Sequence, residues 1–367
     1  MVASESILML AIRMSTTALA HISIDGSVLE GGGQLLRNSV ALSALLGKPI
    51  AVHKIRNGRK PPGLRRQHEA GIKLVGDICS ANASGVSVKS CAMDFVPGPI
   101  QTGKAYSADP GGTNASMAPQ IDYTQKIFLP FLRDQFDMSS DLDLRVEKRG
   151  YFPRGGGKVC CSIPPISGPL PALTLTARGD VTVIRGEARV GNLPAHLAQT
   201  MVEGAEAELV RAGYGSVPFE IAAIREKNEA AVASGGGILL WAETSTGCRI
   251  GGSALSEKKK EPKDVGEEAA KELAANLQHG GCVDEYLQVV VSHSKASIAR
   301  LTRCRTKSLY SWLLRKELPL TAIWVAELLT NAKFEVQDNS DGTKTITCHG
   351  IGYTALQAPP SSHNCKG

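Results

Sequence analysis

The sequence of 367 residues has few aromatic side chains, no paired-cysteine motif and no long hydrophobic run. Only 5% of the residues are aromatic while 38 are glycine, which favours an α/β chain with many tight turns over an aromatic-rich β-sandwich. No stretch is long and apolar enough to span a bilayer, so we expect no membrane partner. The nine cysteines include no C-x-x-C pair, and we therefore expect reduced thiols in an intracellular protein without a zinc site.

The usual catalytic signatures are also missing. The eight histidines are dispersed and form no H-x-x-x-H pair, and no serine or cysteine lies in a nucleophile-elbow motif. No general acid–base pair can be assigned from spacing. The segment "GGGQLLR" (31–37) matches neither the P-loop nor the dinucleotide-binding template, so taken alone it indicates only a tight turn before a helix.

The order of apolar and polar residues predicts alternating strands and helices. The first third reads strand, helix, strand, helix, strand, over residues 21–27, 34–47, 49–56, 64–79 and 85–97. Gly47 is the expected C-cap of the first helix. A glycine turn followed by a helix, and then a pair of strands, recurs between 111 and 162, so the unit is a candidate internal repeat.

A change of character near residue 182 suggests a second domain. Two strands lie within 235–255, and a clear helix follows, for which Asp264 and Glu267 have capping-box spacing. We predict an α/β (α+β) fold in which repeated sheet-plus-two-helix units form a large domain that carries a smaller inserted α/β domain. The predicted boundaries are 21–184 and 281–357 for the large domain, 185–280 for the insert, 1–20 for a disordered extension and 358–367 for a tail.

Positive charge is concentrated near the N-terminal glycines. Residues 31–75 hold many lysines and arginines against one acid, Glu69, and several of the arginines lie in Gly/Pro loops or at helix starts. Arginine forks and helix N-termini both bind phosphate, so a nucleotide or RNA phosphate site is one interpretation. The alternative is a solvated basic face. The overall charge of +6 permits a polyanionic partner without requiring one.

Several long motifs, ordered along the chain, resemble the RNA 3'-terminal phosphate cyclase family, and specifically its true cyclase branch. They are "IDGSVLEGGGQLLR" (24–37), "KIRNGRKPPGLRRQH" (54–68), "GGTNASMAPQIDYT" (111–124), "RGYFPRGGGKV" (149–159), "AETSTGC" (242–248), "HGGCVDEYLQ" (279–288) and "CHGIG" (348–352).

The resemblance implies a substrate and a reaction. Members of the family convert an RNA 3'-phosphate into a 2',3'-cyclic phosphate with ATP and a divalent metal, Mg²⁺ or Mn²⁺. A histidine takes AMP from ATP, the AMP passes to the RNA 3'-phosphate, and the neighbouring 2'-OH displaces it. The partner is therefore RNA with a 3'-phosphate end, and the family location is the nucleus or cytoplasm.

The resemblance also implies nucleotide- and phosphate-binding residues. Each has a plain structural alternative: a capped turn for Glu30, solvation for the arginines, a loop stop for Pro119 and half-buried packing for Tyr286. The implied set is Glu30, Arg37, Arg56, Arg59, Gln67, Pro119, Tyr286, Leu287 and Gln288.

Two departures from the family pattern bear on activity. The chain runs directly from Asp109 to Pro110, where the family has a further helix and strand. The stretch 289–320 is unlike the family, and Leu318 occupies the position of the nucleophilic histidine. His293 lies in this stretch, but nothing positions it as a substitute. A shifted reading frame or misjoined exon would produce matched flanks around such a middle.

Three interpretations follow from the sequence. The first is an ATP-dependent cyclase. The second is a non-catalytic RNA-binding relative with a role in ribosome biogenesis. The third is an unstable isoform without activity. The catalytic residue is unknown because the family histidine is absent from this chain.

Overall fold

The computed structural model describes residues 21–29, 31–100, 106–115, 118–164, 170–288, 302–306 and 318–353. These residues form two compact units. The first comprises residues 1–101 with 312–331, and the second comprises residues 102–311 with 332–367. In the described part of the chain, no helix has both the length and the apolar character needed to cross a membrane.

The first unit contains a four-stranded sheet with the order β1-β2-β4-β3. Strand β1 (Ile22–Asp25) pairs in parallel with β2 (Ile50–His53), while β4 (Met93–Val96) is antiparallel to both β2 and β3 (Asn82–Ser84). The alternating strand residues Ile24, Ile50, Val52 and Phe95 are buried. They form the sheet side of a core.

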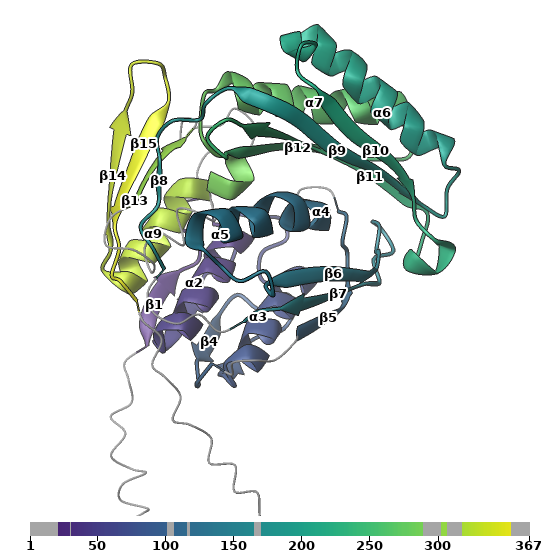
Figure 1. Ribbon diagram of the computed structural model, residues 1–367. Helices are drawn as coiled ribbons and strands as arrows, with labels where there is room; N and C mark the ends of the chain where they lie inside the picture. Colours follow the sequence, from purple (N-terminus) through teal and green to yellow (C-terminus); the bar gives the residue numbers. More distant parts are fainter. Residues whose placement is uncertain are drawn as a thin grey trace, which may run out of the picture. The chain divides into compact units, whose positions relative to one another are not determined.

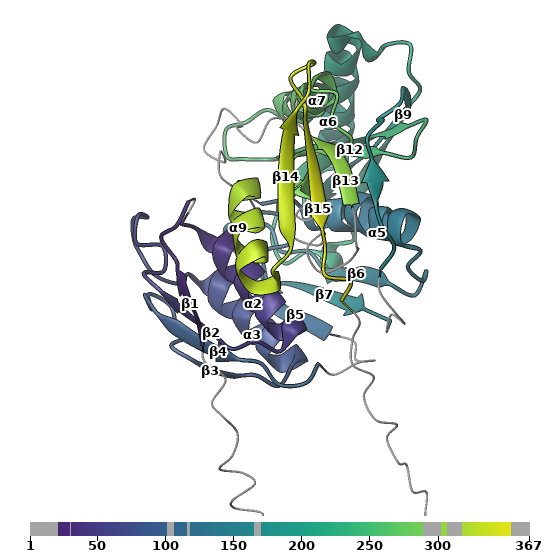
Figure 2. The same ribbon diagram turned by 90° about the vertical axis from the view of Figure 1, so that its left-hand side faces the viewer.

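Helices α2 (Gly33–Leu46) and α3 (Arg66–Ile78) lie on one side of this sheet (Figure 2). Leu35, Leu36, Val40 and Leu42 of α2 are buried, and Gly47 ends the helix in the left-handed conformation, as the sequence predicts. Helix α9 (Leu318–Thr330) packs on α2, and the Nζ atom of Lys48 donates a hydrogen bond of 2.7 Å to the carbonyl of Leu329.

The second unit begins with a three-stranded antiparallel sheet, β5-β7-β6. Its strands are β5 (Tyr106–Gly111), β6 (Asp143–Lys148) and β7 (Gly157–Ser162). The connection between β5 and β6 is a continuous helix whose middle is wider than an α-helix. Helices α4 (Ile121–Tyr123) and α5 (Leu129–Phe136) are joined without a break by the π-helical turn η1 (Thr124–Phe128).

A second sheet of this unit has the order β10-β9-β11-β12. Its members are β9 (Val181–Gly191), β10 (Phe219–Arg225), β11 (Gly235–Thr244) and β12 (Arg249–Leu255). Helices α6 (His196–Leu209) and α7 (Pro262–Gln278) pack side by side on one face of it (Figure 1). The α6 helix continues into the π turn η2 (Val210–Tyr214), and the 3-10 turn η3 (Asn228–Ala230) lies between β10 and β11.

A third sheet, β14-β15-β13-β8, completes the second unit. It is formed by β8 (Thr174–Leu175), β13 (Thr302–Thr306), β14 (Lys333–Asp338) and β15 (Lys344–His349). Figure 2 shows β14 and β15 as an extended hairpin beside β13. Phe131 and Phe136 of α5 pack in one apolar cluster with Leu173, Leu175 and Cys304 of this sheet region.

The predicted fold class is confirmed: the chain is a mixed α/β protein with several sheets and helices. One local prediction is wrong. Asp264 is not the N-cap of α7, because the helix begins at Pro262 with Glu261 as its N-cap. Proline is well suited to the first helical turn, and Asp264 then lies in that turn, where a carboxylate stabilises the positive end of the helix. The predicted domain boundaries remain predictions, and the extension 1–20 and tail 358–367 lie outside the described residues.

The Asp109–Pro110 junction lies within β5, so the chain crosses it as a single strand. Ala108 pairs with Val159 and Gly111 pairs with Gly157, so two residues on β5 oppose one on β7. This is a β-bulge, which tolerates a proline because the ladder is locally interrupted. Strand β5 is an edge of its three-stranded sheet.

Two glycines allow α6 and α7 to approach closely. A Cβ atom added at Gly266 would lie 1.9 Å from the carbonyl oxygen of Met201, and one at Gly204 would lie 2.3 Å from that of Lys263. We expect Gly266→Ala to lower the free energy of unfolding by about 1–3 kcal/mol, because the helices must separate. Urea denaturation measures this.

The matched control is Gly71→Ala in α3, where an added Cβ meets nothing within 4 Å. That substitution should leave stability unchanged or raise it by about 0.5–1 kcal/mol. Equal stability of Gly266→Ala and wild type would contradict the close approach of the two helices.

Candidate functional site

The N-terminal glycines bring a histidine and an arginine against the start of α2. Gly31 has a φ of +54°, in the left-handed region that favours glycine. A Cβ at Gly33 would lie 2.2 Å from Nε2 of His68 and 3.1 Å from Nη1 of Arg37. Gly31 is therefore needed for the turn, and Gly33 for the space that these two side chains occupy. Glu30 lies outside the described residues.

His68 is the buried centre of a cationic cluster, which we define as His68 with Arg37, Arg56 and Arg65. The imidazole is 3% exposed, and its Nδ1 accepts a hydrogen bond of 3.2 Å from the backbone N–H of Arg65 at the start of α3. Burial, followed by the charges of Arg37, Arg56 and Arg65, lowers the pKa of His68 to about 4. The ring is thus neutral at pH 7, with its proton on Nε2.

The loop after β2 shapes this cluster. Arg56 has a φ of +53°, and its Nη1 donates to the carbonyls of Pro61 at 3.4 Å and Gly63 at 3.3 Å. The backbone N–H of Arg59 donates to the carbonyl of Arg56 at 2.9 Å, which closes a turn. Gly63 has a φ of +78°, and a Cβ there would lie 2.3 Å from the carbonyl oxygen of Lys89. Contacts to backbone carbonyls therefore hold the loop in place. The side chain of Arg37, on α2, is exposed.

The second unit contains a buried ion network centred on Arg149. Its guanidinium donates two hydrogen bonds to Asp122, of 2.7 and 2.8 Å, and a third of 2.6 Å to Glu226. Arg189 pairs with Glu226 at 2.8 Å, and Asn114 donates to Asp122 at 3.2 Å. This network joins the motifs "GGTNASMAPQIDYT" and "RGYFPRGGGKV" to strand β9 and to the segment after β10.

Asp122 is charged despite its burial. Desolvation acts to raise the pKa of this carboxyl, but the hydrogen bonds and charge of Arg149, with Arg189 and Asn114, outweigh it and hold the pKa below the usual 3.8. Gln120 continues the polar layer. Its Oε1 accepts from Asn114 at 2.9 Å, and its Nε2 donates to the carbonyls of Ile238 and Ala254 at 3.2 and 3.0 Å.

Asp284 organises the motif "HGGCVDEYLQ". Its carboxylate accepts hydrogen bonds from the Tyr123 hydroxyl at 2.6 Å and from the backbone N–H groups of Gly251, Tyr286 and Leu287 at 2.8, 3.1 and 2.9 Å. Burial raises the pKa of Asp284 above its usual value. The rings of Tyr123 and Tyr286 meet edge to face, with centroids 5.5 Å apart.

The structure places the predicted site residues in both units. In the first, Arg37 and Arg56 are brought together around His68, Arg59 is half-buried in the loop, and Gln67 is exposed in the first turn of α3. In the second, Pro119 is exposed, Tyr286 is half-buried, and Leu287 and Gln288 are buried at 1% and 4% exposure. Binding by these residues stays a prediction. The stretch 289–301 with His293 lies outside the described residues, and Leu318 begins α9.

Sequence reasoning did not single out the residues that organise each unit: His68 in the first unit, and Asn114, Gln120, Asp122, Arg149 and Asp284 in the second. All of them lie inside the quoted motifs. Each of them is a polar residue within a turn-rich motif, which the sequence shows. The distant segment that each one contacts cannot be deduced from local spacing.

Comparisons with known proteins identify the family to which these motifs belong. The sequence profile described as "RNA 3'-terminal phosphate cyclase" matches residues 28–111, and the profile of the cyclase "insert domain" matches residues 176–278. The RNA 3'-terminal phosphate cyclase of Drosophila melanogaster is 33% identical over 362 residues, which cover 90% of this chain and 97% of the fly protein.

The chain belongs to the RNA 3'-terminal phosphate cyclase family. Two further cyclases extend the similarity to distant organisms. The probable enzyme of Dictyostelium discoideum is 32% identical, over 90% of this chain and 83% of its own length. The enzyme of Pyrobaculum neutrophilum is 31% identical, over 90% of this chain and 99% of its own length. The cationic cluster falls within the cyclase profile, whereas β9 to β12 with α6 and α7 fall within the insert profile.

The neutral state of His68 predicts a pH dependence of stability. The unfolded chain binds a proton near pH 6.5, but the folded chain does so only near pH 4. Stability should therefore fall as the pH drops from 6.5 to about 4, by on the order of 2–3 kcal/mol, and this group should cause no further loss below that pH.

Urea unfolding between pH 7 and pH 4 measures this dependence. His68→Gln should flatten the curve, whereas the control His53→Gln, which leaves His68 in place, should keep it. An unchanged curve in His68→Gln would show that His68 is not the group responsible.

Loss of the Arg149 guanidinium would leave Asp122 buried without its main partner. We expect Arg149→Gln to cost about 3–5 kcal/mol of stability at pH 7. In wild type, the contribution of Asp122 to the free energy of unfolding is present above pH 3.8. It is lost as the pH falls through the lower pKa that Asp122 has in the folded state. In the variant the pKa of Asp122 rises, so the stability difference should shrink on acidification.

Thermal or urea unfolding at pH 7 and pH 3 tests this prediction. Arg145→Gln is the control, because this side chain of β6 is 74% exposed. It should change stability by less than about 0.5 kcal/mol. An Arg149→Gln protein no less stable than the control would refute the proposed role of the network.

Proposed function

We propose that the fold is built for ATP-dependent conversion of an RNA 3'-phosphate into a 2',3'-cyclic phosphate, and that the cationic cluster binds the reacting phosphates. The observation that carries the proposal is the convergence of Arg37, Arg56 and Arg65 on a single buried, neutral histidine. Guanidinium groups bind phosphate oxygens bidentately and remain charged at every working pH.

The neutrality of His68 supports a phosphate site. A protonated imidazole would add a fourth cation to the cluster, which the neighbouring arginines oppose. The neutral ring accepts the backbone N–H of Arg65 and so positions the start of α3. His68 is therefore a positioning residue in this proposal rather than the nucleophile.

The proposed chemistry follows from the reactivity of phosphate monoesters. The RNA 3'-phosphate is a poor electrophile until one of its oxygens carries a good leaving group. Transfer of AMP from ATP releases pyrophosphate and creates that leaving group. Attack by the adjacent 2'-oxygen then forms the ring, loses a proton and expels AMP, with the advantage of an intramolecular reaction. The guanidinium groups stabilise the negative charge on the phosphates.

The divalent cation is proposed only as a companion of the ATP phosphates. Within the described ranges, no group of three or more His, Cys, Asp or Glu side chains is arranged to hold a metal ion. These residues therefore do not fit a protein-held metal, and we derive no step through one. Mg²⁺ commonly enters sites with substrate phosphates rather than in an all-protein cage.

Leu318 favours a second candidate function. This residue is the first of α9 and occupies the position at which the family resemblance places a nucleophilic histidine. A leucine side chain cannot accept AMP, so we propose that this chain binds its ligands without forming the enzyme–AMP intermediate. The alternative is then a non-catalytic RNA-binding cyclase-like protein, with ribosome biogenesis as the proposed setting.

Incubation with α-labelled ATP separates these functions. We expect no label on the chain as it stands, together with measurable binding of an RNA that ends in a 3'-phosphate. If the Leu318→His variant is labelled and the unaltered chain is not, position 318 is supported as the position of the nucleophile. Labelling of the unaltered chain would contradict this assignment. If both proteins bind the 3'-phosphate RNA and neither is labelled, the non-catalytic alternative is supported. Arg37→Gln should weaken binding of the 3'-phosphate RNA in every case.

A further inference from the structure

An open crevice in the insert region is lined by none of the residues assigned above. Its volume is about 360 Å³, and it is lined by Asn192, Leu193, Pro194, Arg225 and Asn228. The first three follow β9 directly, Arg225 is the last residue of β10, and Asn228 begins the turn after it. The crevice therefore lies at the carboxyl ends of two parallel strands, where open α/β sheets bind ligands.

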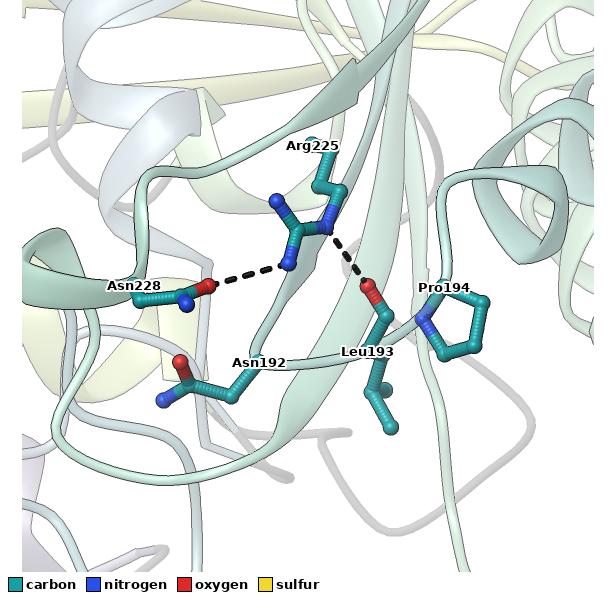
Figure 3. Close-up of a pocket in the computed structure, with 5 residues that line it drawn as sticks. All are labelled: Asn192, Leu193, Pro194, Arg225 and Asn228. Atoms are coloured by element: carbon teal, nitrogen blue, oxygen red, sulfur yellow. Dashed lines mark hydrogen bonds between the residues drawn. The ribbon is translucent and has the colours of Figure 1, made fainter.

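The guanidinium of Arg225 is held in a fixed orientation at this crevice. Its Nε donates to the carbonyl of Leu193 at 3.2 Å, and its Nη2 donates to Oδ1 of Asn228 at 3.0 Å. Figure 3 shows the group held between these two partners. Its Nη1 has no partner among the described residues, so a donor edge of a preorganised cation is left for a ligand.

The charge around Arg225 favours an anion. None of the five lining residues carries a carboxylate. The neighbouring Glu226 is committed to Arg149 and Arg189, at 2.6 and 2.8 Å, so its charge is neutralised within the buried network. The crevice also opens beside the start of α6, whose first turn contains no acidic residue. The positive electrostatic potential at the N-terminus of α6 adds to that of Arg225.

The remaining lining suits a nucleotide better than a bare anion. Leu193 and Pro194 form an apolar wall against which a ribose or the face of a base can pack. The Nδ2 of Asn228 and the Oδ1 of Asn192 have no partners within the described ranges, and they offer one donor and one acceptor to a base edge. Single-stranded RNA presents these three chemistries together: a phosphate, an apolar face and a polar edge.

We infer that this crevice binds an internal nucleotide of a single-stranded RNA, with Arg225 on its phosphodiester. The inference rests on the proposed RNA substrate and adds to it a second contact that is independent of the 3'-end. The insert would then contribute affinity for the RNA strand, while the cationic cluster would recognise the terminal phosphate.

The test compares binding of an oligoribonucleotide of about 16 nucleotides, the upper range of common single-strand sites, with either a 3'-hydroxyl or a 3'-phosphate end. Arg225→Gln should lower the affinity for both RNAs by about fivefold, the upper range for an exposed ion pair. It should also reduce the slope of log K against log salt by about 0.7, the value for one phosphate contact on a single strand. Arg225→Lys should retain the salt slope with weaker binding, because it keeps the charge but loses the fork.

Arg211→Gln is the matched control. Arg211 is an exposed arginine of the same region, 61% exposed, and lies beyond the opposite end of α6, a helix of 14 residues and therefore ~21 Å long. This variant should bind both RNAs as wild type does. Equal melting temperatures of the variants exclude misfolding as the cause of weaker binding.

The outcomes separate this inference from the proposed function. Unchanged RNA affinity and salt slope in Arg225→Gln would overturn the inference, as would an effect confined to ATP binding, which would assign the crevice to a free nucleotide. Absence of RNA binding by the wild type would overturn both. If Arg225→Gln lowers the affinity for both RNAs but the wild type shows no preference for the 3'-phosphate end, the inference about the crevice is supported and the proposed function is contradicted.

Discussion

The guanidinium of Arg149 is the interaction on which the larger unit depends. It is almost completely buried and holds carboxylates from two different segments, Asp122 and Glu226. Charges in such a position are stable only when their hydrogen-bonding capacity is filled. Asn114 and Arg189 complete the set, and Gln120 extends it to the backbone of β11 and β12. The four stretches that meet in this network must therefore fold together, because removal of one partner leaves the remaining charges buried without compensation.

The family motifs thus serve two physical purposes. In the second unit their polar residues face inward and hold the scaffold, as Asp284 does with its four donors. In the first unit they present positive charge around a neutral ring, with Gly33 providing the space. Among the described residues, both arrangements are built mainly from side chains within the motifs that resemble the family.

Local patterns in the sequence predicted the elements well where one face is apolar. Helix α2, with its buried leucines and Gly47 cap, is an example. Strands β11 and β12 were also predicted, although β11 is an apolar run that is buried on both faces. The N-terminus of α7 was misplaced because capping-box spacing and a proline at the first turn are competing signals, and proline prevailed. The partners of Arg149 and His68 could not be predicted, since hydrogen bonds between residues tens of positions apart leave no periodic trace. The resemblance identified Arg37 and Arg56 but not the buried histidine that unites them.

The π-helical turn between α4 and α5 has a wider consequence. Residues before and within it, Tyr123 and Ile127, pack with Leu239 and Trp241, whereas Leu129 just after it packs with Leu142 and Leu144. A residue added to one helical turn rotates everything beyond it by about 100° relative to a regular α-helix. One continuous rod can therefore contact two different cores, and Phe128 at the end of the turn packs against both of them. Deletion of a single residue there would leave the helix intact while turning its second half away from the surface it covers.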